Sequence, residues 1–346
     1  MARVLQDTIT NFNLGNCTLA LALDFSKAFD KVWLNGLTYK ILSKHHLPPF
    51  AATLLHSYLM HRTSRVRVDG SRSKEVAYHA GVPQGSVLSP TLFNLYISDF
   101  PQTPTTKLAL FADDSMVYAH AQLESTARKF VQRHISKITP WCKKWKLHLN
   151  HSKCESILLT RKHKPIPIRP LCIKKVPIPV KDKIKYLGVT IDKRVNLSHI
   201  AHAVSKAFVS YRNLYSILSP PSPLSLENKV LVYKQIIRPA ILYAAPILAR
   251  SSDTQLARIQ IMQNRILRCI TKSRMRTRIT DMHRWANIDT IKQHVFKLAE
   301  KFYTTLVYSS PLTSSLTQTR YDPNVHRINK PLYHRLPLYL EPFIPP

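Results

Sequence analysis

The chain has 346 residues, and its 51 lysines and arginines outnumber its 19 aspartates and glutamates to give a formal net charge of +32. Such an excess of cations indicates a polyanionic partner, because lysine and arginine bind phosphates with release of condensed counterions. With 45% apolar residues the chain can bury a sizeable core, and its length suggests about two domains. Ribosomal and chromatin-type proteins are equally basic, so charge alone does not identify the kind of nucleic-acid protein.

Cysteine usage and hydropathy limit the cellular compartments in which the protein is expected. The five cysteines are odd in number and lack CxxC spacing, which argues against a disulfide framework and against a zinc knuckle. No signal-peptide core opens the chain, and no apolar run has the length that crosses a bilayer. We therefore expect reduced thiols and an intracellular protein, in the nucleus or the cytoplasm.

The first informative segment is the apolar run 19–23, which ends at Asp24. Its composition predicts a buried strand with a carboxylate at its end. Asp24 can serve as a metal ligand, or as the N-cap of a helix through residues 27–29, since Asp is common at strand-to-helix junctions. The two roles are compatible.

The next segment is the loop 81–90, followed by the apolar stretch 92–97, which predicts a helix. Gly81 and Gly85, two of the chain's six glycines, fall in this loop. Glycine there indicates unusual dihedral angles or a close approach of the backbone to a ligand.

The third segment is Phe111-Ala112-Asp113-Asp114. Residues 108–112 predict a short buried strand and residues 115–118 its partner, which puts two adjacent carboxylates on a tight turn. Adjacent carboxylates that lose water repel one another, and they take up a proton or bind a divalent cation. An Asp-Asp pair alone is more often a solvated turn. Together with Asp24, however, it fits a two-metal site, in which oxygen ligands from separate strands hold ions about 4 Å apart.

The rest of the chain separates into two kinds of pattern. Residues 127–145 predict a helix, and the proline-punctuated region 166–184 predicts short edge strands joined by turns. From about residue 197 apolar residues recur at helical spacing, and Pro220-Pro221-Ser222-Pro223 breaks that region as a hinge-like loop. The helical positions are Val204, Ala207, Phe208, Tyr211, Leu214, Tyr215 and Leu218, and then Leu256, Ile259, Gln263, Ile266, Leu267 and Ile270.

Three tryptophans lie among basic residues, as in Lys143-Lys144-Trp145-Lys146. Trp141, Trp145 and Trp285 can stack on bases or pack in a core, and packing is the more frequent fate of tryptophan.

Taken in order, the three acidic and glycine-bearing segments resemble motifs A, B and C of reverse transcriptases, and the FADD form resembles the non-LTR (LINE-type) retrotransposon branch. Residues 149–155 are similar to the family's motif D, and residues 185–192 to the motif that joins palm to thumb. Residues 228–239 and 259–268 are similar to the helical region that follows the polymerase in jockey-type elements. The resemblance runs from about residue 18 to about residue 301.

The resemblance implies roles for individual residues. Asp24, Asp113 and Asp114 are expected to hold two magnesium ions, or manganese in their place, with Asp113 the more direct ligand of the pair. Phe29 matches the aromatic residue that excludes a ribose 2′-hydroxyl, and a core aromatic is the rival interpretation. Gln84 and Gly85 match the loop that contacts the incoming deoxynucleotide and the template. Lys153 matches a general acid for the departing pyrophosphate, and an exposed lysine without a role is the rival.

The expected fold is α+β: a right-hand polymerase palm over 18–192, preceded by a remnant of fingers over 1–17. A helical thumb with its continuation over 193–308 and a poorly ordered Pro-rich tail over 309–346 would follow. The resemblance implies an RNA-directed DNA polymerase with an RNA template, a DNA primer or nicked target DNA, and deoxynucleoside triphosphates, acting in the nucleus. Relatives carry a fingers region before motif A, so the chain is expected to be an N-terminally truncated copy. The alternative is a non-catalytic RNA- or DNA-binding remnant.

Overall fold

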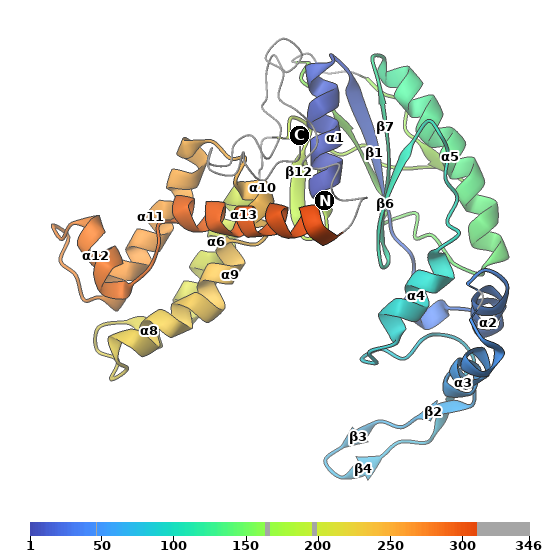
Figure 1. Ribbon diagram of the computed structural model, residues 1–346, viewed down its shortest axis with the longest axis horizontal. Coiled ribbons are helices and arrows are strands. Elements are labelled where there is room, and N and C mark those ends of the chain that lie inside the picture. The colour runs from blue at the N-terminus through green and yellow to red at the C-terminus, as the bar shows by residue number, and fades with distance from the viewer. Residues whose placement is uncertain (46, 163–166, 196–198, 310–346) are drawn as a thin grey trace. The chain divides into compact units, whose positions relative to one another are not determined.

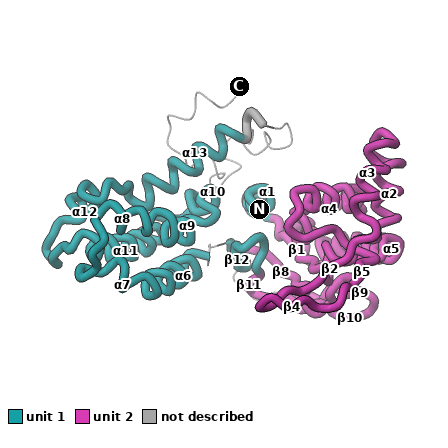
Figure 2. The backbone as a smooth tube through the Cα atoms, turned by 90° about the horizontal axis from the view of Figure 1, so that it is seen from below, with its two compact units in different colours: residues 1–15, 185–346 teal, residues 16–184 magenta. Residues whose placement is uncertain are grey.

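The computed structural model describes residues 1–45, 47–162, 167–195 and 199–309, so the tail expected from residue 309 lies almost wholly outside the described residues. Backbone contacts divide the chain into two compact units (Figure 2). Residues 16–184 form one, called here the sheet unit, and residues 1–15 with 185–346 form the other, called the helical unit.

The sheet unit is built on a four-stranded antiparallel sheet of order β6-β7-β1-β8 (Figure 1). Its strands are β1 (Cys17–Leu23), β6 (Lys107–Phe111), β7 (Asp114–Ala121) and β8 (Glu155–Leu159). In β1 every residue except Ala22 is buried, because the strand is paired on both sides, with β7 and with β8. The prediction of a buried strand that ends at Asp24 is confirmed.

The prediction of a second buried strand, over 108–112, is wrong in one respect. Strand β6 forms, but it is an edge strand that pairs only with β7, and its apolar side chains are largely accessible: Leu110 is 38% and Phe111 65% exposed. A short apolar run predicts a strand without showing how many neighbours the strand has, so edge and centre look alike in sequence.

Helix α5 (Glu124–Lys144) packs against β1 and β7 and begins three residues before the predicted start at Ala127. Its buried positions recur at helical spacing and face the sheet, as expected for an amphipathic helix. These positions are Ala127, Val131, His134, Ile135, Ile138 and Cys142.

The remaining elements of the sheet unit surround this layer. Its other helices are the 3₁₀ turn η1 (Phe29–Lys31), α2 (Leu34–Ser43), α3 (Pro49–Leu59) and α4 (Ser89–Ile97). Its short strands are β2 (Arg62–Ser64), β3 (Arg67–Val68), β4 (Ser71–Arg72), β5 (Val76–Tyr78), β9 (Cys172–Ile173) and β10 (Val176–Pro177). The short strands β9 and β10 match the prediction of brief strands joined by turns within 166–184.

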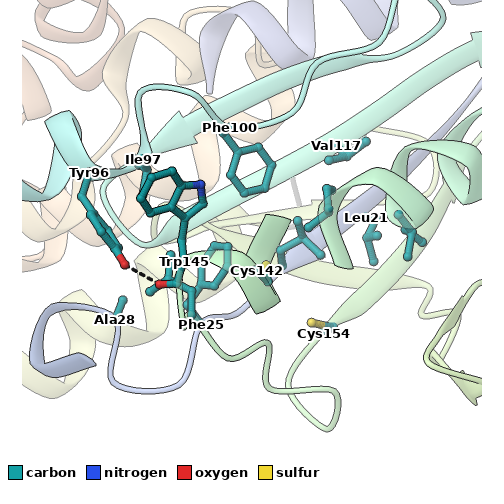
Figure 3. Packing of buried hydrophobic residues seen from close by; sticks show 14 of the residues in the cluster. Leu21, Phe25, Ala28, Tyr96, Ile97, Phe100, Val117, Cys142, Trp145 and Cys154 are labelled. Atoms are coloured by element: carbon teal, nitrogen blue, oxygen red, sulfur yellow. Dashed lines mark hydrogen bonds between the residues drawn. The ribbon is translucent and has the colours of Figure 1, made fainter. Parts of the chain in front are cut away.

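Aromatic residues fill the core beneath α4 and α5 (Figure 3). The Trp145 side chain is 4% exposed, and the Tyr96 hydroxyl donates a hydrogen bond to the Trp145 carbonyl. Phe25 and Phe100 meet edge to face with ring centroids 6.2 Å apart, an arrangement that aromatic pairs favour. Trp145 is therefore a core residue, while Trp285 in the helical unit is 54% exposed.

A fully buried ammonium group lies in the same region. Lys40 on α2 is 0% exposed, and its Nζ lies 2.5 Å from Asp99 Oδ1 and 3.6 Å from the centre of the Trp145 ring. Lys44 Nζ lies 3.1 Å from Asp99 Oδ2, and Trp141 Nε1 donates to Asp99 Oδ1 at 3.1 Å. The carboxylate and its donors thus join α2 and α5 to the turn that follows α4.

The helical unit contains α1 (Ala2–Asn13) and a hairpin of β11 (Lys183–Tyr186), which includes the unit boundary, with β12 (Val189–Asp192). Its other elements are α6 (His199–Asn213), α7 (Tyr215–Leu218), α8 (Leu226–Val232), a π-helical turn η2 (Tyr233–Ile237), α9 (Arg238–Ile241), α10 (Ala245–Leu248), α11 (Asp253–Ile270), α12 (Ile279–Ala286) and α13 (Ile291–Ser309).

Helix α11 confirms the helical pattern read from residues 256–270, because all six predicted positions are buried. The Ser252 side chain caps its first turn and Gln255 returns the bond, a capping box that fixes the helix start. The pattern before it is confirmed as helix in α6 and α7, but Phe208 and Tyr215 are 36% and 51% exposed. The proline-rich stretch 220–223 forms the predicted loop between α7 and α8. Among the described residues, no helix combines the length and apolarity needed to span a bilayer.

Candidate active site

The two adjacent carboxylates lie on the turn between β6 and β7. Phe111 pairs with Asp114, which leaves Ala112 and Asp113 as the two turn residues, and Ala112 has a left-handed backbone with φ of 51°. A two-residue connection holds both strands in register and turns the carboxylates away from the apolar core. Asp113 and Asp114 are accordingly exposed. The predicted turn is confirmed.

Asp24 lies at the adjacent strand end. Leu23, the last residue of β1, pairs with Ser115, so the antiparallel register brings Asp24 opposite Asp114. The Asp24 carbonyl accepts a hydrogen bond from the Asn150 backbone at 2.8 Å, and its backbone N–H donates to Cys154 Sγ at 3.5 Å. Both ends of its peptide unit are therefore held while the side chain stays half-buried.

The three carboxylates interact electrostatically. Partial burial, followed by the charges of Asp113 and Asp24, raises the pKa of Asp114 above its ordinary value. Burial and the two neighbouring charges all disfavour the ionised form of Asp114, as expected for acids that share a site. Within the described ranges, no three His, Cys, Asp or Glu side chains are gathered tightly enough to hold one ion. The donor set still suits magnesium, which takes one or two carboxylates together with waters and substrate phosphates.

The loop 81–90 is fastened to the segment that follows Asp24. The Gly81 N–H donates to the Val32 carbonyl and the Val82 N–H to the Phe29 carbonyl, both at 2.9 Å. Gln84 Nε2 donates to Asp30 Oδ1 at 2.8 Å. The loop 81–90 is thereby held against residues 29–32, within the sheet unit.

Gly81 shows why this junction needs glycine. Its φ is +94°, and a Cβ built there would lie 2.8 Å from the Asp30 carbonyl oxygen, which is backbone and cannot easily move. Gly85 has a φ of +87° with nothing within 4 Å of such a Cβ, so its requirement is conformational only. Gln84 and Gly85 are both exposed and accessible to a ligand.

Phe29 satisfies part of each interpretation given to it. Its ring stacks on Phe93 of α4 with centroids 4.6 Å apart and an interplanar angle of 24°, and it packs against the core. It is nevertheless only half-buried. Packing on Phe93 limits the ring's motion, which is what a rigid steric gate would need.

Lys153 lies on the loop that anchors Asp24. The Ser26 N–H donates to the His148 carbonyl at 2.8 Å, and the Lys153 N–H donates to the Asn150 carbonyl at 3.1 Å. The loop's backbone is therefore fixed to residues 24–26, while the Lys153 side chain is exposed. The structure brings all the predicted site residues into the sheet unit.

A model of the family described as reverse transcriptase (RNA-dependent DNA polymerase) matches residues 2–191 of this chain. The chain belongs to the reverse transcriptase family. It is 34% identical over 325 residues to the "Probable RNA-directed DNA polymerase from transposon X-element" of Drosophila melanogaster, which covers 92% of this chain and 35% of the relative. It is 30% identical over 289 residues to the "RNA-directed DNA polymerase from mobile element jockey" of the same organism, covering 81% of this chain and 31% of the relative.

These matches confirm the resemblance to reverse transcriptases of non-LTR transposons, jockey included. The chain spans about a third of the length of these relatives. Among solved structures, apo telomerase from Candida tropicalis matches at a TM-score of 0.41 and 13% identity, over 91% of this chain and 56% of that one.

Several residues that build this candidate site were not assigned a role from sequence. Asp30 orients Gln84, and Asn150 and Cys154 fix the Asp24 peptide. Asp30 lies six residues after Asp24 in the same segment, so its position carried a signal. Asn150 and Cys154 fall within residues 149–155, which resemble motif D, but that resemblance does not reveal that the Asn150 N–H and the Cys154 thiol contact the Asp24 peptide.

Proposed function

We propose that this chain carries the polymerase centre of a non-LTR retrotransposon reverse transcriptase. It would extend the 3′-hydroxyl of a DNA primer with deoxynucleotides on an RNA template. The observation that carries the proposal is the meeting of Asp24 with Asp113 and Asp114 at one end of the sheet, where burial and then the charges of Asp113 and Asp24 raise the pKa of Asp114. Acids brought together against their mutual repulsion are typical of functional sites.

Asp24, Asp113 and Asp114 are the residues that would hold magnesium or manganese, with Asp113 as the more direct ligand of its pair. When bound, two such ions would activate the primer hydroxyl and stabilise charge on the phosphates. The raised pKa of Asp114 fits this role, because a carboxylate destabilised by its neighbours gains most from a cation. The fixed Asp24 peptide and the tight turn pre-orient the ligands.

The surrounding residues would position the nucleotide and complete the transfer. Gln84 and Gly85 lie on the exposed part of a loop that is fastened to residues 29–32, a suitable surface for the incoming triphosphate. The Phe29 ring, supported by Phe93, would clash with a 2′-hydroxyl and so favour deoxynucleotides. The exposed Lys153 ammonium would stabilise or protonate the departing pyrophosphate.

We further propose that the sheet unit is the palm of the polymerase and that the helical unit supplies the thumb. The 51 lysines and arginines would bind template RNA and primer or nicked target DNA, with salt-sensitive affinity. Chromosomal DNA as target places this reaction in the nucleus.

Primer extension on an RNA template separates catalysis from binding. The wild-type chain should extend a DNA primer only when magnesium or manganese is present, and the Asp113→Ala variant should not, while both bind the primer–template equally. If the wild-type chain binds but never extends, it is a non-catalytic RNA- or DNA-binding protein and the proposal fails.

A further inference from the structure

A two-stranded ribbon extends from the sheet unit between α3 and the loop 81–90 (Figure 1). It runs over residues 62–78 and is called here the basic ribbon. Arg62 pairs with Tyr78 at its base, and Val68 pairs with Ser71 at its tip. Between Val68 and Ser71, Asp69 and Gly70 both have positive φ, of 46° and 84°, as in the turns that close hairpins.

Cations dominate this ribbon. Its two carboxylates are Asp69 at the tip and Glu75, and Glu75 already pairs with Arg65 at 2.5 Å. The cations are Arg62, Arg65, Arg67, Arg72 and Lys74. All five except Arg62 are exposed, so the charge faces solvent along most of the ribbon's length.

Two of these cations are held directly opposite each other. Arg67 on β3 pairs with Arg72 on β4, and the register is fixed next to them by the Ser73 N–H, which donates to the Val66 carbonyl at 2.9 Å. Like charges directly opposite in an antiparallel pair destabilise it. A polyanion bound across the two guanidinium groups would turn this repulsion into attraction, and arginine is well shaped for phosphate.

The ribbon is rooted at the candidate active site. It starts three residues after α3 ends at Leu59 and finishes three residues before Gly81. The Tyr58 hydroxyl at the end of α3 donates to Ser86 Oγ at 2.8 Å, which ties the ribbon's base to the loop that carries Gln84 and Gly85. A polynucleotide that passes this loop would therefore meet the ribbon next.

The ribbon also exposes apolar side chains suited to unpaired bases. Val66, Val68, Val76 and Tyr78 are 65%, 62%, 58% and 47% exposed. Side chains alternate along a strand, so Arg67 and Val68 of β3 lie on opposite faces.

We propose that the basic ribbon binds the single-stranded part of a nucleic acid ahead of the polymerase site. The backbone phosphates would lie on the arginines, and bases would contact the valines and Tyr78. Naming that strand as the RNA template rests on the proposed function, whereas the binding itself does not.

The test uses the full chain and a fluorescein-labelled 20-nucleotide single-stranded RNA titrated over a range of salt. The Arg67→Gln/Arg72→Gln variant should bind about tenfold more weakly at 0.1 M salt, and its salt slope should fall by about 1.4, the value for two lost phosphate contacts. The Lys129→Gln/Arg133→Gln variant removes two exposed cations from α5 and is the matched control, for which we expect an unchanged slope. A fully duplex RNA should bind the wild-type chain and the ribbon variant alike.

An equal loss in the ribbon variant and the α5 control would overturn the proposal, because bulk charge would then explain the binding. A second pair of results would also overturn it. If Val66→Ser/Val68→Ser changed the sedimentation coefficient of the chain while Arg67→Gln/Arg72→Gln left the salt slope of RNA binding intact, the ribbon would bind a protein partner and not a nucleic acid. The titrations are repeated in the Asp113→Ala background, where extension is absent. A reduced slope there supports the ribbon even if the chain never extends a primer.

Primer extension adds a second readout. The ribbon variant should lose efficiency on templates with a ten-nucleotide single-stranded overhang and not on templates with a two-nucleotide overhang. If the ribbon variant extended primers with equal efficiency on both overhangs, the proposed role of the ribbon would be refuted, while the proposed polymerase function would stand.

Discussion

The sheet unit contains two groups of charged residues that differ in how their charges are paired. Where β1 ends and β7 begins, Asp24, Asp113 and Asp114 repel one another, and burial together with that repulsion raises the pKa of Asp114. Between α2, α5 and the turn after α4, burial lowers the pKa of Lys40 to about 8, while Asp99, 2.5 Å away, favours the charged form. Among the described residues the first group, called here the repelling group, holds charges of one sign, whereas the second, the compensated group, pairs opposite charges.

This difference in charge pairing distinguishes a candidate ligand-binding group from a group that supports the packing of the core. Burial would raise the pKa of Asp99, but hydrogen bonds from Lys40 and Lys44 hold it below its ordinary value. The Asp99 carboxylate is thus stabilised by cations of the protein itself, although burial still lowers the pKa of Lys40 to about 8. The carboxylates where β1 ends and β7 begins would instead be stabilised by a proton or by an added cation, which is the pattern expected of a binding site.

The largest expected effect concerns the repelling group. Asp24→Asn keeps the shape of the side chain but removes its charge, and we expect the rate of primer extension to fall at least about a thousandfold, as when a charge-stabilising group is lost. Asp30→Asn is the control in the same segment, since asparagine can still accept the bond from Gln84. Comparable losses in both variants would show that the segment needs its fold and not the Asp24 charge.

The second effect concerns the compensated group. Lys40→Met removes the ammonium group and leaves the Tyr96 carbonyl and Asp99 without their buried donor, so we expect about 2 kcal/mol less stability in urea unfolding. Lys44→Met removes a half-exposed partner of the same carboxylate and should cost about 0.5 kcal/mol. Equal costs would mean that burial does not distinguish the two lysines.

The sequence was sufficient for the carboxylate group because its signals are local. Apolar runs ending at Asp24 and at Phe111 predicted strands with acids at their ends, and strand, turn and partner all form there. Helix α11 followed from periodicity alone, since its buried positions are those predicted. Each of these inferences needed only the spacing of residues within one element.

The compensated group could not be predicted, because its members lie far apart in sequence. Lys40, Asp99 and Trp141 meet only through the packing of three helices, and a lysine within a helix is ordinarily exposed. The same reason explains why β6 proved to be an exposed edge strand and why Cys154 was not assigned to the Asp24 peptide. Pairing partners and buried neighbours are properties of the tertiary fold.

A third prediction tests a charge that belongs to neither group. Lys153 is exposed on a fixed loop, so Lys153→Met should leave the urea midpoint unchanged. Because we propose that its ammonium group assists the departing pyrophosphate, we expect single-turnover extension to slow about tenfold. The control is Lys129→Met on α5, which should alter neither quantity. An unchanged rate for Lys153→Met would leave it an ordinary surface lysine.

The smallest expected effect is a gain in the stability of an Asp113 variant that loses activity. Because the folded-state pKa of Asp114 lies above its unfolded value, the folded chain binds the proton more tightly and loses stability as pH rises between those two values. Asp113→Asn removes one repelling charge, so at pH 7 and low salt the variant should be more stable by about 0.5 kcal/mol. The gain should shrink as pH falls and Asp114 takes up its proton, and in high salt, which screens the repulsion. A loss of stability at pH 7 would show that Asp113 supports the turn, and the contrast between the repelling and the compensated groups would then no longer hold.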